Sequence, residues 1–164
     1  MSRKIEKLRV PVRLALIGCA PVEGHLSLAP NAELHDGPET LLERLNSPTR
    51  VVPFHRAEDD AFLLVVRAHI EWLVAGPEVA PQLVRTVHYQ HTREEHVRVR
   101  LLGGATHDGV LAFEMPHEFN RASDFLNGDE DYFPLRTSQG VMLIHKDCVL
   151  DIRLRGVVVD RRAA

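Results

Sequence analysis

Apolar and polar residues alternate through several stretches of this chain. "HVRVRLLGG" (96–104) places an apolar residue at every second position and charged residues between them, which is typical of a half-buried strand. "VLDIRLR" (149–155) shows the same alternation, whereas "GVMLIHKD" (140–147) contains the continuous apolar run of a buried strand. Turn residues separate these short stretches. The pattern therefore predicts a mainly β protein.

The strand pattern occurs twice along the chain. "VRLALIGCAPVEGHLSL" (12–28) and "VRVRLLGGATHDGVLAF" (97–113) are identical at seven of 17 positions. Two further blocks follow in the same order, with residues 43–54 matching 124–135 and residues 62–73 matching 141–152. Self-similarity in three ordered blocks predicts a tandem duplication.

Each copy is predicted to hold five strands, with a short helical insertion between the second and third. In the first copy the insertion is "DGPETLLERLN" (36–46), with Pro38 in the first turn of the helix. In the second copy it is "NRASDFLN" (120–127), with Asn120 as the N-cap. This arrangement indicates two tandem small five-stranded barrels of the SH3 or Sm type.

Glycine and proline add two finer expectations. Gly24 and Gly109 occupy equivalent places at the start of each second strand, where we expect turns with positive φ. Pro134 lies in the third strand of the second copy, "YFPL", which suggests an edge strand because proline cannot donate to the ladder.

The two repeats are expected at residues 1–75 and 95–164, joined by a linker at 76–94. Within that linker, "QLVRTVHYQ" (82–90) is rich in β-branched residues, which favours a bridging strand over a helix. Three histidines (His88, His91 and His96) lie in or beside it. In a strand His88 and His91 point to opposite faces and form a connector, whereas in a helix they share a face and can bind a metal.

Composition limits the classes of function. The chain has 164 residues, 45% of them hydrophobic, and a net charge of −3, so no overall field attracts nucleic acid or an anionic membrane. Cys19 and Cys148 are its two cysteines, which is typical of a reducing cytoplasm. "LIGC" (16–19) fits a lipoprotein cleavage box, but the apolar run before it is short and the repeat aligns it with the end of a first strand. We therefore expect a cytoplasmic location.

The sequence contains no Walker A loop, Rossmann glycine fingerprint, nucleophile elbow, HExxH helix or CxxC pair. Ser123-Asp124 is interpreted as a helix start, not a triad fragment, and the acidic groups at 58–60 and 129–131 as exposed turns, not calcium ligands. Trp72 and the six phenylalanines are interpreted as core or barrel-seam residues. The sequence thus predicts no catalytic residue, no cofactor and no metal ligand.

Two resemblances extend this interpretation. "RASDFLNGDEDYFPL…GVMLIHKDCVLDI" resembles a family of short uncharacterised bacterial β-domains that carry an R-x-S-D-F-L-N…F-P-L block. The matching residues are Arg121, Ser123, Asp124, Phe125, Leu126, Asn127, Phe133, Pro134 and Leu135. The first copy departs from this block before the shared Leu-Asn, and the resemblance implies a fold more than a chemistry.

The second resemblance is in strand topology. "VRVRLLGGATHDGVLAF" and "LIHKDCVLDIRL" look like the opening and closing strand pairs of Sm-like RNA-binding proteins. That likeness implies an RNA site at His145 and Lys146, with Arg67 and His69 as the counterparts in the first copy.

The sequence favours a non-enzymatic adaptor or assembly subunit that binds protein partners through its duplicated barrel, with self-association as a further expectation. An Sm-like RNA-binding protein is the alternative, and it needs a basic patch. Four arginines (Arg98, Arg100, Arg153 and Arg155) supply one if they share a face. A metal-dependent enzyme that uses the linker histidines is a third, less favoured, hypothesis.

Overall fold

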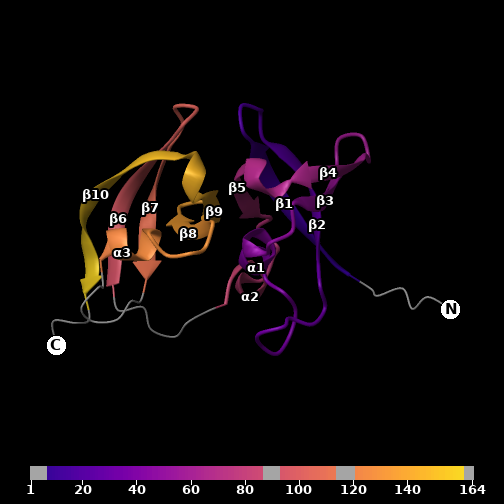
Figure 1. Ribbon diagram of the computed structural model, residues 1–164, viewed down its shortest axis with the longest axis horizontal. Coiled ribbons are helices and arrows are strands. Elements are labelled where there is room, and N and C mark those ends of the chain that lie inside the picture. Colours follow the sequence, from indigo (N-terminus) through magenta and orange to yellow (C-terminus); the bar gives the residue numbers. More distant parts are fainter. Residues whose placement is uncertain (1–6, 87–92, 114–120, 161–164) are drawn as a thin grey trace. The chain divides into compact units, whose positions relative to one another are not determined.

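The computed structural model describes residues 7–86, 93–113 and 121–160, and it is built mainly of β-strands (Figure 1). The chain forms two compact units, Met1–Val87 and His88–Ala164. The described part contains no helix of the length and apolar character needed to cross a membrane.

Unit 1 is a five-stranded antiparallel sheet with two short α-helices. Its elements in chain order are β1 (Leu8–Leu16), β2 (Val22–Leu28), α1 (Leu41–Asn46), β3 (Val51–Arg56), β4 (Phe62–Val66), the 3-10 turn η1 (Arg67–His69), β5 (Ile70–Ala75) and α2 (Pro81–Val84). The strands are ordered β5-β1-β2-β3-β4 in the sheet.

Unit 2 has the same succession of strands, insertion and 3-10 turn. Its elements are β6 (Arg93–Leu101), β7 (Thr106–Phe113), α3 (Ala122–Leu126), β8 (Tyr132–Thr137), β9 (Gly140–His145), η3 (Lys146–Cys148) and β10 (Val149–Asp160). The strands are ordered β10-β6-β7-β8-β9. The mainly β class is therefore confirmed, and each helical insertion lies between the second and third strands. Among the described pairings, none joins β4 to β5 or β9 to β10, so closure of each sheet into a barrel stays a prediction.

Alternation places the core on one face of each sheet. In β6 the buried apolar residues are Val97, Val99 and Leu101, with at most 1% of their surface exposed, and the arginines between them face outward. Glu95, two residues before Val97, is buried as well. Burying each of the apolar side chains stabilises the fold by about 1.5–3 kcal/mol. The sequence pattern and the core therefore agree for this strand.

Helix α1 begins later than the sequence suggested. Its N-cap is Thr40, whose hydroxyl accepts from the Glu43 amide while the Glu43 carboxylate accepts from the Thr40 amide. Pro38 precedes this capping box, so its assignment to the first helical turn is wrong. This reciprocal cap gives the backbone amides of Thr40 and Glu43 a hydrogen-bond acceptor, which favours a helix that starts after Thr40. Leu41 and Leu45, four residues apart, are fully buried.

The other two helices correct or limit the predictions. Helix α3 begins at Ala122 after Arg121, which makes no side-chain capping bond, and Asn120 lies outside the described residues. Helix α2 includes residues 82–84, so the strand expected over 82–90 is wrong there because Pro81 at its start favours a helical turn. His88 and His91 lie outside the described residues.

Gly24 and Gly109 lie inside β2 and β7 and do not have positive φ, so their assignment to turns is wrong. Both are glycine because the third strand passes very close. A Cβ on Gly24 would lie 2.1 Å from the His55 carbonyl oxygen, and one on Gly109 would lie 2.6 Å from that of Arg136. A glycine within a strand often marks such a close approach.

Pro134 is not on an edge strand. Strand β8 lies between β7 and β9, and Pro134 pairs with Leu143 of β9. On the other side of β8, the described pairing with β7 is limited to Val110 and Arg136. Pro134 therefore faces a part of β7 where the ladder does not need its missing N–H.

Candidate interaction surface

The residues predicted to bind RNA lie around the two 3-10 turns, one pair in each unit. In unit 1 the Arg67 guanidinium donates to the carbonyl oxygens of Leu45 and Thr49, both at 2.8 Å. These carbonyls belong to the end of α1 and the loop after it. His69 is exposed. Arg67 therefore ties the helical insertion to the turn before β5.

The equivalent pair in unit 2 has similar structural contacts. Lys146 Nζ donates to the Gly128 carbonyl oxygen at 3.1 Å, beyond the end of α3. Burial lowers the pKa of Lys146, although the nearby acidic group 129–131 opposes this shift. His145 is 4% exposed, and its Nδ1 accepts from the Asp147 amide at 3.0 Å. Two of the four predicted residues thus contact backbone carbonyls and a third is buried.

Unit 2 carries a separate arginine-rich face. Arg98 lies opposite Arg153 across the β6–β10 pairing, and Arg100 lies on the same side of β6. Acidic residues occupy this face as well. Asp108 accepts from Arg98 Nε at 2.8 Å, and Asp151 pairs with Arg100. The hydrogen bonds from the two arginines lower the pKa of both carboxyl groups.

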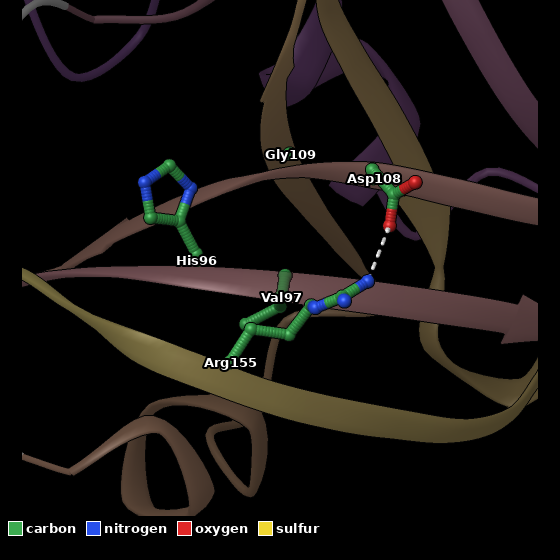
Figure 2. A pocket seen from close by; sticks show the side chains of 5 residues that line it. All are labelled: His96, Val97, Asp108, Gly109 and Arg155. Atoms are coloured by element: carbon green, nitrogen blue, oxygen red, sulfur yellow. Dashed lines mark ion pairs between the residues drawn. The ribbon is translucent and has the colours of Figure 1, made fainter.

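A shallow hollow on the same face is shown in Figure 2. It is lined by His96, Val97, Asp108, Gly109 and Arg155. Arg155 reaches toward Asp108, 3.9 Å away, while the His96 ring points elsewhere (Figure 2). The lining contains no hydroxyl or thiol nucleophile, and its cation and carboxylate pair with each other.

An exposed apolar surface lies on β3 and β4 of unit 1. Phe62 is 81% exposed, Leu64 is 72% exposed and Val51 is 39% exposed. The strand register places Phe62, Leu64 and Val66 beside His55, Pro53 and Val51, respectively. We call the five apolar residues, Val51, Pro53, Phe62, Leu64 and Val66, the β3–β4 face. Large apolar side chains gathered on one exposed face mark interaction sites more often than scattered ones do.

A polar chain of contacts borders this face and holds Phe62. Arg9 Nη2 donates to His55 Nδ1 at 2.6 Å, and His55 Nε2 lies 3.2 Å from Asp60 Oδ1 on the other side of the ring. The Phe62 ring stacks on the His55 ring, with centroids 4.7 Å apart. The phenyl group is therefore held in position while most of its surface faces solvent.

The β3–β4 turn beside the face is acidic. Asp59 accepts from Arg56 Nε at 2.9 Å and from its Nη2 at 2.6 Å, and these bonds lower the pKa of Asp59 to about 2. Asp60 has a φ of 56° at the tip of the turn. The predicted exposed turn is confirmed, because residues 57–60 are all exposed.

The sequence did not identify this apolar surface. Phe62 was assigned with the other aromatics to the core or the barrel seam, and a core position is wrong because Phe62 is 81% exposed on the outer side of β4. The run "FLLVV" (62–66) reads as a strand buried on both faces. Its equivalent in unit 2 is such a strand, since Leu143 is fully buried whereas the matching Leu64 is exposed. Both strands are continuous apolar runs, so the sequence does not distinguish the exposed strand of the first copy from the buried strand of the second.

The metal hypothesis receives no support from the described part of the chain, where no group of three or more histidine, cysteine or acidic residues is placed to hold an ion. His96 is exposed on the outer side of β6. Since His88 and His91 lie outside the described residues, the predicted connector stays a prediction.

No family model, no curated protein and no solved structure matches this chain. Both resemblances therefore stay predictions, and the function is argued from the surfaces alone.

Proposed function

We propose that this chain is a non-enzymatic adaptor or assembly subunit, built from two copies of a small β-barrel, that binds a protein partner through the β3–β4 face. The observation that carries the proposal is the exposure of Phe62 and Leu64. Covering each of these side chains would contribute about 1.5–3 kcal/mol. Aromatic anchors held in place before binding are also typical of interface hot spots.

Equivalent contacts in the two units support the duplicated barrel. A Cβ on Gly24 would meet Phe54 and His55, and one on Gly109 would meet the aligned residues Leu135 and Arg136. The basic residue that begins each 3-10 turn donates to a carbonyl at or after the helical insertion. Shared contacts of this kind are what two copies of one domain are expected to retain.

The surroundings of the face favour a protein over a nucleic acid. Residues 58–60 place three carboxylates next to Phe62, and the chain as a whole carries a net charge of −3. Phosphate groups bind where cations gather, so this border would repel a polyanion. An apolar patch with a charged rim is instead the usual composition of a protein interface.

A photo-crosslinking experiment tests the proposal. Phe62 is replaced by p-benzoylphenylalanine, and the protein is irradiated in an extract of its native cells. Leu34, which is 90% exposed in the loop before α1, receives the same substitution as the control. We expect a discrete protein adduct from position 62 that is absent from position 34. Equal labelling at both positions, or adducts with RNA alone, would contradict the proposal.

RNA binding remains the second candidate, because Arg98, Arg100 and Arg153 do share one face of unit 2. The acidic partners Asp108 and Asp151 offset part of that positive charge. We rank this function lower for that reason.

A further inference from the structure

Strand β4 ends the sheet of unit 1, and its described pairing is with β3. Hydrogen bonds from the Arg56 amide to the Ala61 carbonyl and from the Arg67 amide to the Arg50 carbonyl, both 2.9 Å, flank this ladder. In an antiparallel pair the hydrogen-bonded residues alternate. Residues 61, 63, 65 and 67 therefore direct their amides and carbonyls to β3. Phe62, Leu64 and Val66 direct theirs away from the sheet.

This edge lacks the features that usually prevent strands from pairing with other chains. Natural edges carry charged side chains, proline or bulges. The sequence of β4, FLLVV, has none of these. Strand β10, which ends the sheet of unit 2, differs in carrying Asp151, Arg153, Arg155 and Gly156, with register shifts along its pairing with β6. Of these two strands, β4 is the one suited to pairing.

We propose that β4 pairs antiparallel with β4 of a second copy of this chain, with Leu64 opposite Leu64 and Phe62 opposite Val66. The inference goes beyond the proposed function, because the contact is made by the backbone edge of β4 beside the β3–β4 face. The register brings the outward amides and carbonyls of Phe62, Leu64 and Val66 opposite each other in both strands. Such an isologous contact closes on itself as a twofold dimer, the commonest symmetric assembly.

The charges at the two ends of β4 select the antiparallel direction. Glu58, Asp59 and Asp60 precede the strand, and Arg67 and His69 follow it. Antiparallel pairing brings the acidic turn that precedes β4 in one copy to the same end as the 3-10 turn that follows β4 in the other. A parallel pairing would instead place the acidic groups of the two copies together, which is unfavourable. The charges at the two ends of β4 therefore favour antiparallel over parallel pairing of two copies.

The side chains agree with the same register. Phe62, Leu64 and Val66 lie on one side of β4, so pairing sets the two β3–β4 faces side by side as one apolar surface. Phe62 of each copy then lies across from Val66 of the other, an aromatic–β-branched pair of the kind that stabilises sheets. The dimer thus enlarges the face instead of hiding it.

The oligomeric state gives the first test. Light scattering after gel filtration should return twice the 18.5 kDa of the chain when the protein is loaded at about 50 μM. Leu64→Pro should give the monomer mass, because the Leu64 amide points outward and its loss leaves the β3 ladder intact. Leu34→Pro is the matched control and should stay dimeric. Circular dichroism and thermal melting establish that both variants are folded.

Cysteine crosslinking tests the register and does not depend on the proline variant folding. Cys19 is first replaced by serine, since it is the exposed cysteine. With Leu64→Cys the two Cα atoms should be about 5.5 Å apart, within disulfide range. With Phe62→Cys the two substituted positions lie four residues apart along the paired strands, so their Cα atoms should be about 13 Å or more apart. This variant should therefore stay uncrosslinked under mild oxidation. The pair Phe62→Cys with Val66→Cys should restore the crosslinked dimer.

A monomer mass for the parent protein, or crosslinking of Phe62→Cys as fast as that of Leu64→Cys, would overturn the inference. The oligomeric state and the crosslinking at position 62 together distinguish failure of the dimer inference from failure of the adaptor proposal. A monomeric chain that still forms a protein adduct from position 62 would leave the adaptor proposal standing without the dimer. A dimer that forms no adduct with any other protein would support the inference alone.

Discussion

At the scale of single residues, the two internal glycines show what a sequence can and cannot specify. Gly24 and Gly109 were recognised as equivalent because they align in the repeat. A glycine required for positive φ and one required for close packing look the same in a sequence. The choice between them depends on the path of the third strand, which the local sequence does not contain.

The close packing predicts a cost for any side chain at these positions. Gly24→Ala would place a Cβ 2.1 Å from the His55 carbonyl oxygen and 2.4 Å from the Phe54 ring, so strands β2 and β3 must separate. We expect the free energy of unfolding to fall by about 1–3 kcal/mol, the usual cost of overpacking. Gly109→Ala should behave alike, and urea denaturation measures both.

Gly103 provides the matched control for this prediction. It has no atom within 4 Å of the site of a Cβ, and its φ is not positive. Gly103→Ala should therefore change the free energy of unfolding by less than about 0.5 kcal/mol. Equal urea midpoints for all three variants would show that the close strand crossing is wrong.

At the scale of elements, alternation succeeded where one side of a strand faces solvent through charged residues. Strand β6, with arginines between valines, was predicted correctly for that reason. Strand β4 has leucine and phenylalanine on both of its faces, so its sequence does not show which side meets solvent. The exposure of side chains on an edge strand depends on which other parts of the fold pack against that strand, and the sequence of the strand does not contain this information. The candidate surface therefore could not be predicted, although the strand that carries it was.

Local propensity also failed at α2. The β-branched residues after Pro81 favoured a strand, but a proline in the first turn and the packing of α2 against α1 outweighed that preference. Propensity differences amount to fractions of a kcal/mol per residue, so burial of Val84 is enough to reverse them. Short helices are for this reason harder to predict than strands with a clear alternation.

The capping box of α1 gives a prediction at this scale. Thr40→Ala removes the side-chain oxygen that accepts from the Glu43 amide at 3.1 Å. We expect the free energy of unfolding to fall by about 0.5–2 kcal/mol, as for other N-caps. Ser123→Ala is the control, because Ser123 lies near the start of α3 where no side-chain cap forms, and it should cost less than half as much. Thermal denaturation that shifts equally for both variants would contradict the cap.

At the scale of the whole molecule, several of the basic side chains in the described part of the chain are paired. Arg98 and Arg100 each bind an aspartate, Arg56 binds Asp59, and the ammonium of Lys146 lies on a carbonyl. The sequence could predict the near-neutral total from its composition. It could not predict that Arg98 and Arg100 would meet aspartates, because those two partners come from neighbouring strands.

The pairing of these charges leads to a prediction about RNA. An RNA site depends on unpaired cations, and its affinity falls steeply as salt rises. The chain carries a net charge of −3, and its acidic groups flank both β4 and Lys146. Fluorescence polarisation with single-stranded RNA at physiological salt should therefore detect no binding tighter than about 10 μM. Sub-micromolar affinity that is lost in Lys146→Ala and retained in the control Lys7→Ala would favour the Sm-like function over the adaptor.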